Sequence, residues 1–366
     1  MSTALLTLLL VLMVLAQGTL FRRRALKRLT YQRTFSTRTA FVGEQVDLVE
    51  IIANRKLLPL PWLKAESRLS TALVFGSTHT SAEETSLVSG NQGVAYHSSV
   101  FFLGPYSQVT RRHHVTPMRR GVFSAHSVSL TCGDLFGTNA AQQQLDTGAE
   151  LIVYPRLLNE QDVSLPSSRD QGDLIVRRWI APDPFLIQGI RPYRAGDAQR
   201  DVHWAATART GSLQVKARDY TADPHLLVLL NVQRTVDQWG DLMDYEQQEI
   251  EQAISYAATL CLAALHAGVG AGFAANAPIA EDGVPVLMMP ERAAGRDAEI
   301  LEALARLRIL RIRTMHAFLD DLIGITGLDI VVLTAYTDAW IEERLEALRR
   351  AGNTVSVRWP AQRDTP

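Results

Sequence analysis

The sequence predicts a multidomain α+β protein with an N-terminal membrane helix, an antiparallel β-sandwich (Ig-like) domain and a C-terminal α/β domain. Three features predict this fold class: an uncharged apolar run at the N-terminus, a long series of short β-prone segments, and then apolar strand candidates that alternate with helical patterns. A chain of 366 residues is too long for one ordinary core, which favours several domains. The hydrophobic share of 47% and the charged share of 20% are typical of globular domains.

Residues 1–21 predict a transmembrane anchor, because they carry no charged side chain and about 20 apolar residues suffice to span a bilayer as a helix. Residues 22–40 then form a basic juxtamembrane segment with seven basic residues between Arg22 and Arg38. Basic flanks stay cytoplasmic, so we expect a single-pass protein of the inner (plasma) membrane with a cytoplasmic body. A cleaved signal peptide ending near Val14-Leu15-Ala16 is the alternative, but its usual positive charge before the apolar run is missing.

Residues 41–165 predict the β-sandwich domain. Gly, Pro and polar clusters separate the strand candidates, which are Val42–Ile52, Val94–Leu103, Gln108–Val115 and Val122–Cys132. A Leu-Pro-Leu-Pro-Trp run that ends at Trp62 predicts a turn, because its prolines exclude both a helix and a central strand. His113 and His114 are adjacent in a strand candidate, so their side chains point to opposite faces and a shared metal ion is not expected.

Residues 223–366 predict the α/β domain. Leu226–Val232 and Leu328–Thr334 are continuous apolar runs of the kind found in strands that are buried on both faces. A helical pattern follows each of them, over Asp244–His266 and Asp338–Ala351. Strands that alternate with helices indicate βαβ units and a mostly parallel sheet.

Residues 166–222 join the two domains and contain the densest run of specific side chains, between positions 190 and 218. A turn at Gly196 opens a short predicted helix with Asp197 as its N-cap. Gly211 is predicted to end this helix. Leu213–Lys216 then predicts a strand.

Two runs within this segment resemble the signature of the bacterial domain-of-unknown-function family 58: Arg-Pro-Tyr-Arg-x-Gly-Asp, which starts at Arg191, and Val-His-Trp-x-Ala-Thr-Ala-Arg-Thr-Gly, which ends at Gly211. The resemblance implies an uncharacterised membrane protein whose C-terminal domain is similar to von Willebrand factor A, a Rossmann-type fold. It also implies a partner, an AAA+ ATPase of the MoxR type. Many members carry two membrane helices, whereas this sequence predicts one. The signature positions expected to act as structural ties or as a docking surface are Arg191, Tyr193, Gly196, Asp197, His203, Trp204, Thr207, Arg209 and Gly211.

Domains similar to von Willebrand factor A often hold Mg²⁺ through Asp-x-Ser-x-Ser after the first strand. A hard cation prefers oxygen ligands, and the aspartate offsets its charge. The corresponding positions in this chain are Asn231, Gln233 and Thr235, with Asp338 as a later carboxylate. A neutral amide replaces the aspartate, and the cationic Arg234 stands among the ligands. We therefore expect a degenerate site without a metal, and no cofactor.

His203 with Asp197 or Asp201 is the arrangement that indicates an enzyme, because a histidine beside a carboxylate acts as a base in hydrolases and transferases. A catalytic triad, however, requires residues that meet in space rather than neighbours in sequence. Hydrogen bonds that hold the segment in place explain His203 and Arg209 without catalysis. We therefore expect no catalytic residue, and a hydrolase or transferase built on His203 remains the alternative.

The predicted function is that of a non-enzymatic, membrane-anchored interaction scaffold that acts with the ATPase. Its partners are expected at the carboxyl ends of the α/β strands, around Asn231–Thr235 and Tyr336–Asp338. The net charge of −1 gives no overall basic field for nucleic acid. Cys132 and Cys261 lie far apart and form neither a disulfide framework nor a zinc motif. The sequence leaves the oligomeric state and the process served open.

Overall fold

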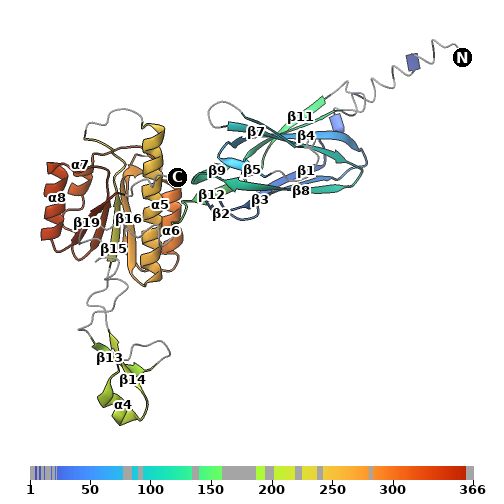
Figure 1. Ribbon diagram of the computed structural model, residues 1–366. Coiled ribbons are helices and arrows are strands. Elements are labelled where there is room, and N and C mark those ends of the chain that lie inside the picture. Colours follow the sequence, from blue (N-terminus) through green and yellow to red (C-terminus); the bar gives the residue numbers. More distant parts are fainter. Residues whose placement is uncertain are drawn as a thin grey trace, which may run out of the picture. The chain divides into compact units, whose positions relative to one another are not determined.

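Figure 1 shows the computed structural model of the chain. It describes residues 23–76, 85–89, 94–133, 140–158, 187–193, 202–218, 225–236, 242–279 and 283–359, and also positions 5, 8, 9, 12, 18 and 21. The chain divides into two compact units, Met1–Arg156 and Leu157–Pro366. The predicted domain boundary at residue 165 lies outside the described residues. Within the described ranges no helix is long and apolar enough to cross a membrane, and most of the predicted anchor falls outside those ranges.

The first unit is built from strands in two main sheets and one small sheet (Figure 1). The four-stranded sheet has the order β1-β3-β8-β5, the five-stranded sheet β11-β10-β4-β7-β6 and the small sheet β2-β12-β9. Their bounds are β1 Leu29–Phe35, β2 Thr39–Phe41, β3 Val46–Asn54, β4 Leu60–Ser70, β5 Leu73–Phe75, β6 Thr85–Ser89, β7 Val94–Leu103, β8 Gln108–Pro117, β9 Gly121–Ser124, β10 Ser127–Gly133, β11 Ala140–Asp146 and β12 Glu150–Tyr154.

The sandwich follows from the alternation of apolar and polar side chains along the strands. In β3, for example, every second residue from Val46 to Ile52 is buried, while Asp47, Val49 and Ile51 between them are partly exposed. Two apolar clusters form the core. One is drawn from β1, β3, β4, β7, β10 and β11 of the main sheets, and the other combines β3, β4, β5 and β8 with β2 and β12 of the small sheet. Neighbouring strands within both main sheets are antiparallel. The predicted antiparallel β-sandwich is confirmed.

The sandwich begins earlier in the chain than the sequence indicated. Strands β1 and β2 lie within residues 22–40, which were predicted to be a basic juxtamembrane segment. β1 pairs with β3 along its whole length, from Leu29 to Phe35, and turns Tyr31 and Arg33 inward. The preceding Phe21 is also buried in the sandwich core. The prediction of a separate segment over residues 22–40 was wrong for these strands, because their inward side chains belong to the core.

Strand β4 corrects a second expectation, that the prolines before Trp62 exclude a central strand. β4 begins at Leu60 and lies between β10 and β7. Its pairing with β7 shifts register between Leu60 and Leu63, and Pro61 falls in this irregularity, where its missing N–H breaks no regular ladder. The Trp62 ring packs on Gly133 of β10, where an added Cβ would come within 2.2 Å of the ring.

The second unit contains a small lobe and an α/β domain. The lobe consists of the antiparallel strands β13 (Ile187–Pro192) and β14 (Gln214–Arg218) with helix α4 (Trp204–Thr210). The α/β domain has the sheet order β17-β16-β15-β18-β19. Its elements are β15 His225–Leu230, α5 Asp244–His266, β16 Gly270–Pro278, β17 Pro285–Glu291, α6 Arg296–Arg306, α7 Met315–Asp320, β18 Asp329–Leu333, α8 Ala339–Arg350 and β19 Thr354–Arg358.

The α/β sheet is mostly parallel, as the alternating pattern predicted. β15 pairs in parallel with β16 and β18, β18 pairs in parallel with β19, and only β17 is antiparallel. Helices α5 and α6 cover one face and α7 and α8 the other (Figure 1). β15 is therefore buried on both faces, which explains its unbroken apolar run.

Candidate functional site

The carboxyl edge of the α/β sheet holds a buried network of amides and hydroxyls where the degenerate metal site was predicted. Asn231 follows β15, and its side chain is fully buried. Asn231 Nδ2 donates to Thr334 Oγ1 at 3.0 Å, and Asn231 Oδ1 accepts from Asn276 Nδ2 at 2.8 Å and from the Gln233 backbone N–H at 3.0 Å. Because Thr334 follows β18 and Asn276 lies in β16, the network ties three strands together.

The other predicted metal positions are also engaged by protein. Gln233 Nε2 donates to the carbonyl oxygens of Thr235 and Val236 at 2.8 and 2.9 Å. Asp338 is the N-cap of α8 and accepts from the Ile341 N–H at 2.7 Å. The predicted positions are thus brought to one edge. The side-chain amides of Asn231 and Gln233, however, form hydrogen bonds with neighbouring protein groups and do not face a common metal position.

Arg234 places a positive charge beside this network. Its Nη1 lies 2.5 Å from Glu249 Oε2 of α5, and its guanidinium stacks on the Trp359 ring at 5.4 Å from the ring centroid. Within the described ranges no three His, Cys, Asp or Glu side chains are grouped so as to hold a metal ion. The positions after β15 therefore present neutral amides beside a guanidinium, and the Asp338 carboxylate is engaged as a helix cap, which together make a poor set of ligands for a hard cation.

Four exposed apolar side chains lie at the same edge of the sheet as the network. Val236 follows β15, and Met243 and Tyr245 stand at the start of α5; their exposed fractions are 51%, 63% and 53%. Trp340, 63% exposed, lies in the first turn of α8, which follows β18. The carboxyl ends of the parallel strands β15 and β18 meet at one edge, so these four side chains belong to the same edge of the domain.

The signature lobe is held together by His203 and Thr207. His203 is the N-cap of α4: its Nδ1 accepts from the Ala206 N–H at 3.1 Å. Thr207 Oγ1 accepts from the Gln214 N–H of β14 at 3.0 Å, and Gly211 ends the helix with a left-handed φ of 67°. The prediction of Asp197 as N-cap of this helix was wrong, because the helix starts at Trp204. Gly196, Asp197 and Asp201 lie outside the described residues.

Several side chains of the lobe are open to solvent, although Val202, Gln214 and Val215 are buried. Helix α4 contributes no buried residue, and Trp204 is 66% exposed. Tyr193 and Leu213 are also exposed, with a backbone hydrogen bond between them at 2.9 Å. Arg209 lies exposed in the last turn of α4, and the backbone of Arg191 pairs with Val215. His203 and Thr207 thus serve the lobe's own geometry, while Trp204 faces outward.

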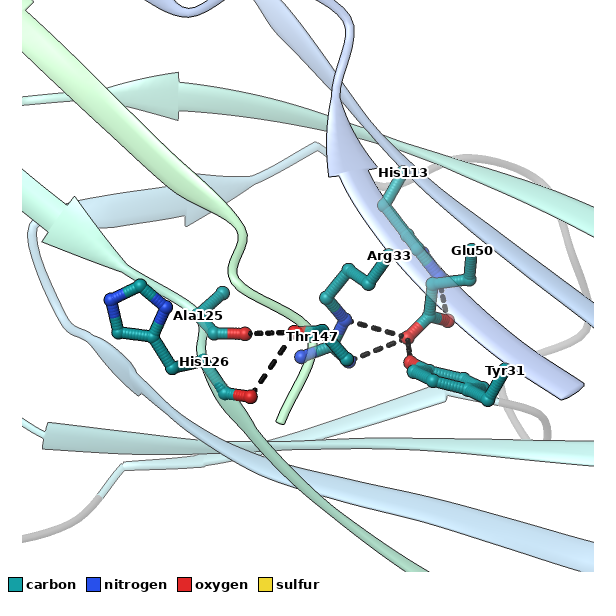
Figure 2. Close-up of polar contacts among 7 residues, drawn as sticks. All are labelled: Tyr31, Arg33, Glu50, His113, Ala125, His126 and Thr147. Carbon is teal, nitrogen blue, oxygen red and sulfur yellow. Dashed lines mark hydrogen bonds and ion pairs between the residues drawn. The ribbon is translucent and has the colours of Figure 1, made fainter. Parts of the chain in front are cut away.

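The sandwich contains a third group of polar side chains, which the sequence analysis missed. Glu50 of β3 is fully buried, and Arg33 of β1 donates to its Oε1 from Nε at 3.1 Å and from Nη2 at 2.5 Å (Figure 2). The Tyr31 hydroxyl donates to the same oxygen at 2.6 Å. His113 Nε2 lies 3.0 Å from Glu50 Oε2 and must carry the proton, since an ionised carboxylate only accepts.

These contacts fix the ionisation of the group. Burial by itself would raise the pKa of Glu50, but the hydrogen bond from His113 and the charge of Arg33 outweigh it and hold that pKa well below its ordinary value. Burial, followed by the negative charge of Glu50, raises the pKa of Tyr31, which keeps its hydroxyl a donor. Glu50 is therefore a buried anion paired with a buried cation.

His97 of β7 also belongs to this buried group. We call the group, Tyr31, Arg33, Glu50, His97 and His113, the polar layer of the sandwich. The His97 ring stacks on Phe75 at 4.8 Å and meets the His113 ring edge-on at 4.8 Å. Burial lowers the pKa of His97 to about 3, so the ring is neutral. One signal in the sequence marks the layer: in β3 the inward alternation Val46, Leu48, Ile52 is interrupted by Glu50 at a core position.

One part of the chain matches a known protein family. Residues 189–305 match the family model described as protein of unknown function DUF58. This range includes most of the small lobe and the first part of the α/β domain with Asn231. No protein with a curated description matches the chain.

Distant similarity links the chain to several solved structures. The CARDB domain of a Pyrococcus furiosus protein is 11% identical and matches over 34% of this chain and 96% of its own, with a TM-score of 0.19. The seventh ScaB type I cohesin of Pseudobacteroides cellulosolvens is 12% identical over 38% of this chain and 97% of its own, with a TM-score of 0.20. The major pilin SpaD of Corynebacterium diphtheriae is 7% identical over 32% and 34%, with a TM-score of 0.24.

Proposed function

Because residues 189–305 make this chain a member of the DUF58 family, we propose that it is a non-enzymatic scaffold that binds a protein partner at the carboxyl edge of its α/β sheet. The proposed partner is an AAA+ ATPase of the MoxR type, as the family resemblance implies. The α/β domain is proposed to be a von Willebrand factor A-like domain that has lost its metal.

The observation that carries this proposal is the Asn231 network. A metal-dependent domain of this kind offers an incompletely ligated cation to its partner, whereas here the Asn231 amide is bonded on both sides to the protein's own strands. The rim around it is apolar and exposed, with Tyr245 and Trp340 as large aromatic side chains. Aromatic side chains at an exposed edge are typical anchors of protein interfaces.

The geometry of His203 argues against the enzymatic alternative. Its Nδ1 accepts a backbone hydrogen bond that caps α4, so this nitrogen is engaged in holding the helix. The carboxylates considered as its partners, Asp197 and Asp201, lie outside the described residues. Nothing else in the described lobe supplies an acid or a second histidine.

We also propose that the predicted anchor, residues 1–21 without the buried Phe21, holds the protein in the inner membrane with its body in the cytoplasm. Support comes from the absence of charge in residues 1–21 and from the basic residues that follow, including the exposed Arg23 and Arg24. Arg33 cannot act as a basic flank of the membrane segment, since its charge is buried against Glu50.

Replacing Tyr245 and Trp340 together by alanine is expected to weaken capture of the MoxR-type ATPase at least about tenfold, because such anchors each contribute more than about 1 kcal/mol to an interface. The measurement is the affinity of the purified full-length protein for the ATPase. Phe102→Ala is the matched control, since Phe102 is an equally exposed aromatic side chain (66%) of the sandwich. Equal affinity of the double variant, the control and the unmodified protein would rule out this edge as the docking surface.

A further inference from the structure

The polar layer of the sandwich contains more polar atoms than its own residues satisfy. Arg33 Nη1, Ser67 Oγ, Ser99 Oγ and both ring nitrogens of His97 are buried without a hydrogen-bond partner among the described residues. His97 and Ser99 are fully buried, Arg33 is 1% exposed and Ser67 4% exposed. Native interiors hold few such atoms, and each is normally matched by protein or by ordered water.

Ser67, His97 and Ser99 share one buried face of the five-stranded sheet. Ser67 and His97 are directly opposite each other on the paired strands β4 and β7, so their side chains lie side by side on one face. Ser99 follows two residues after His97 on β7 and shares its face. From the opposite sheet, His113 meets the His97 ring at 4.8 Å, and the charges of Glu50 and Arg33 act on His97.

The donors and acceptors that lack hydrogen-bond partners indicate which kind of molecule would bind to them. A neutral imidazole offers one donor and one acceptor, each serine hydroxyl offers both, and Arg33 Nη1 donates. The charge of Arg33 is already balanced by Glu50, whose two oxygens are both occupied, so the region carries no net charge for an ion. A mixture of donors and acceptors without net charge suits water, which bonds with two to four such groups.

We propose that the sandwich interior holds a cluster of ordered water molecules that bridge His97, Ser67, Ser99 and Arg33. The bound water joins β4 and β7 of the five-stranded sheet to β1 of the four-stranded sheet. The polar layer is then a fully bonded network between the two apolar clusters of the core. This site is separate from the edge at Asn231 and does not rest on the proposed function.

The test is a crystal structure of the full-length protein at a resolution that shows solvent. The expected result is solvent density at about 2.7–3.2 Å from a ring nitrogen of His97 and from the hydroxyl of Ser67 or Ser99. A filled interior in which these atoms bond directly to other side chains, or one that lacks solvent density, would overturn the proposal.

Two variants sharpen the result. His97→Phe removes both ring nitrogens but keeps an aromatic ring beside Phe75, and it is expected to lose the water bonded to the ring. Ser124→Ala is the matched control, because Ser124 is an exposed serine of β9 in the same unit, and it should leave the internal solvent unchanged. If a variant fails to fold, the solvent density of the unmodified protein still decides the question.

Discussion

Glu50→Gln is expected to destabilise the β-sandwich by about 3–5 kcal/mol, the usual cost of breaking a buried ion pair from one side. The substitution removes the negative charge but leaves Arg33, 1% exposed, with its positive charge in the interior. The hydrogen bonds from Tyr31 and His113 also lose their charged acceptor. Urea denaturation followed through Trp62 measures the effect, because Trp62 is the sole tryptophan of the first unit.

Asp47→Asn is the matched control for this experiment. Asp47 lies on the same strand, three residues earlier, and its carboxylate contacts His114 at 2.6 Å on the partly exposed outer face. An exposed pair of this kind contributes at most about 1 kcal/mol. A loss of stability in Glu50→Gln no larger than that in Asp47→Asn would mean that the buried ion pair does not hold the sandwich together.

The sandwich is expected to lose stability as the pH falls from about 6.5, because His97 has a folded pKa of about 3 and an ordinary value of 6.5. The neutral ring is favoured in the folded state, so the unfolded chain takes up the proton first. This contribution is complete above pH 6.5 and declines by about 1.4 kcal/mol per pH unit as the pH falls toward 3. Glu50, whose pKa is lowered from 4.5, adds a loss of the same sign only below that value.

Urea midpoints measured between pH 7 and pH 5 separate the two groups. His97→Phe is expected to remove most of this pH dependence, since the substituted ring cannot take up a proton. His126→Phe, which changes an exposed histidine of the same unit, is expected to keep it. The same slope in His97→Phe and in the unmodified protein would contradict the assignment to His97.

The sequence predicts most of the architecture because the spacing of apolar residues along the chain differs between strands and helices. The helix predicted over Asp244–His266 has those bounds in the structure, and the apolar run after residue 225 is the central strand β15. Local composition gave a wrong prediction for Arg33. This residue stands in a basic run, yet its position opposite Glu50 in the β1–β3 register makes it a core residue. Charge alone does not distinguish a membrane flank from an inward position on a strand.

The two polar sites differ in how far the sequence predicts them. Asn231 and Gln233 are close in sequence, follow one strand and are found from the family pattern. The polar layer joins Arg33, Glu50 and His97 from β1, β3 and β7, and only the pairing of strands distant in sequence brings them together. The helix of the signature shows a third case: His203 caps α4 although histidine is not a common N-cap, and the more usual Asp197 lies too far upstream.

We propose that a network of amides occupies the carboxyl edge of the α/β sheet, at the position where a von Willebrand factor A domain would hold a metal ion. Calorimetric titration of the full-length protein with Mn²⁺ tests it most directly. We expect no saturable binding in the micromolar range, because Asn231 is bonded within the protein and Asp338 caps α8. Stoichiometric micromolar binding that disappears in Asp338→Asn would contradict it.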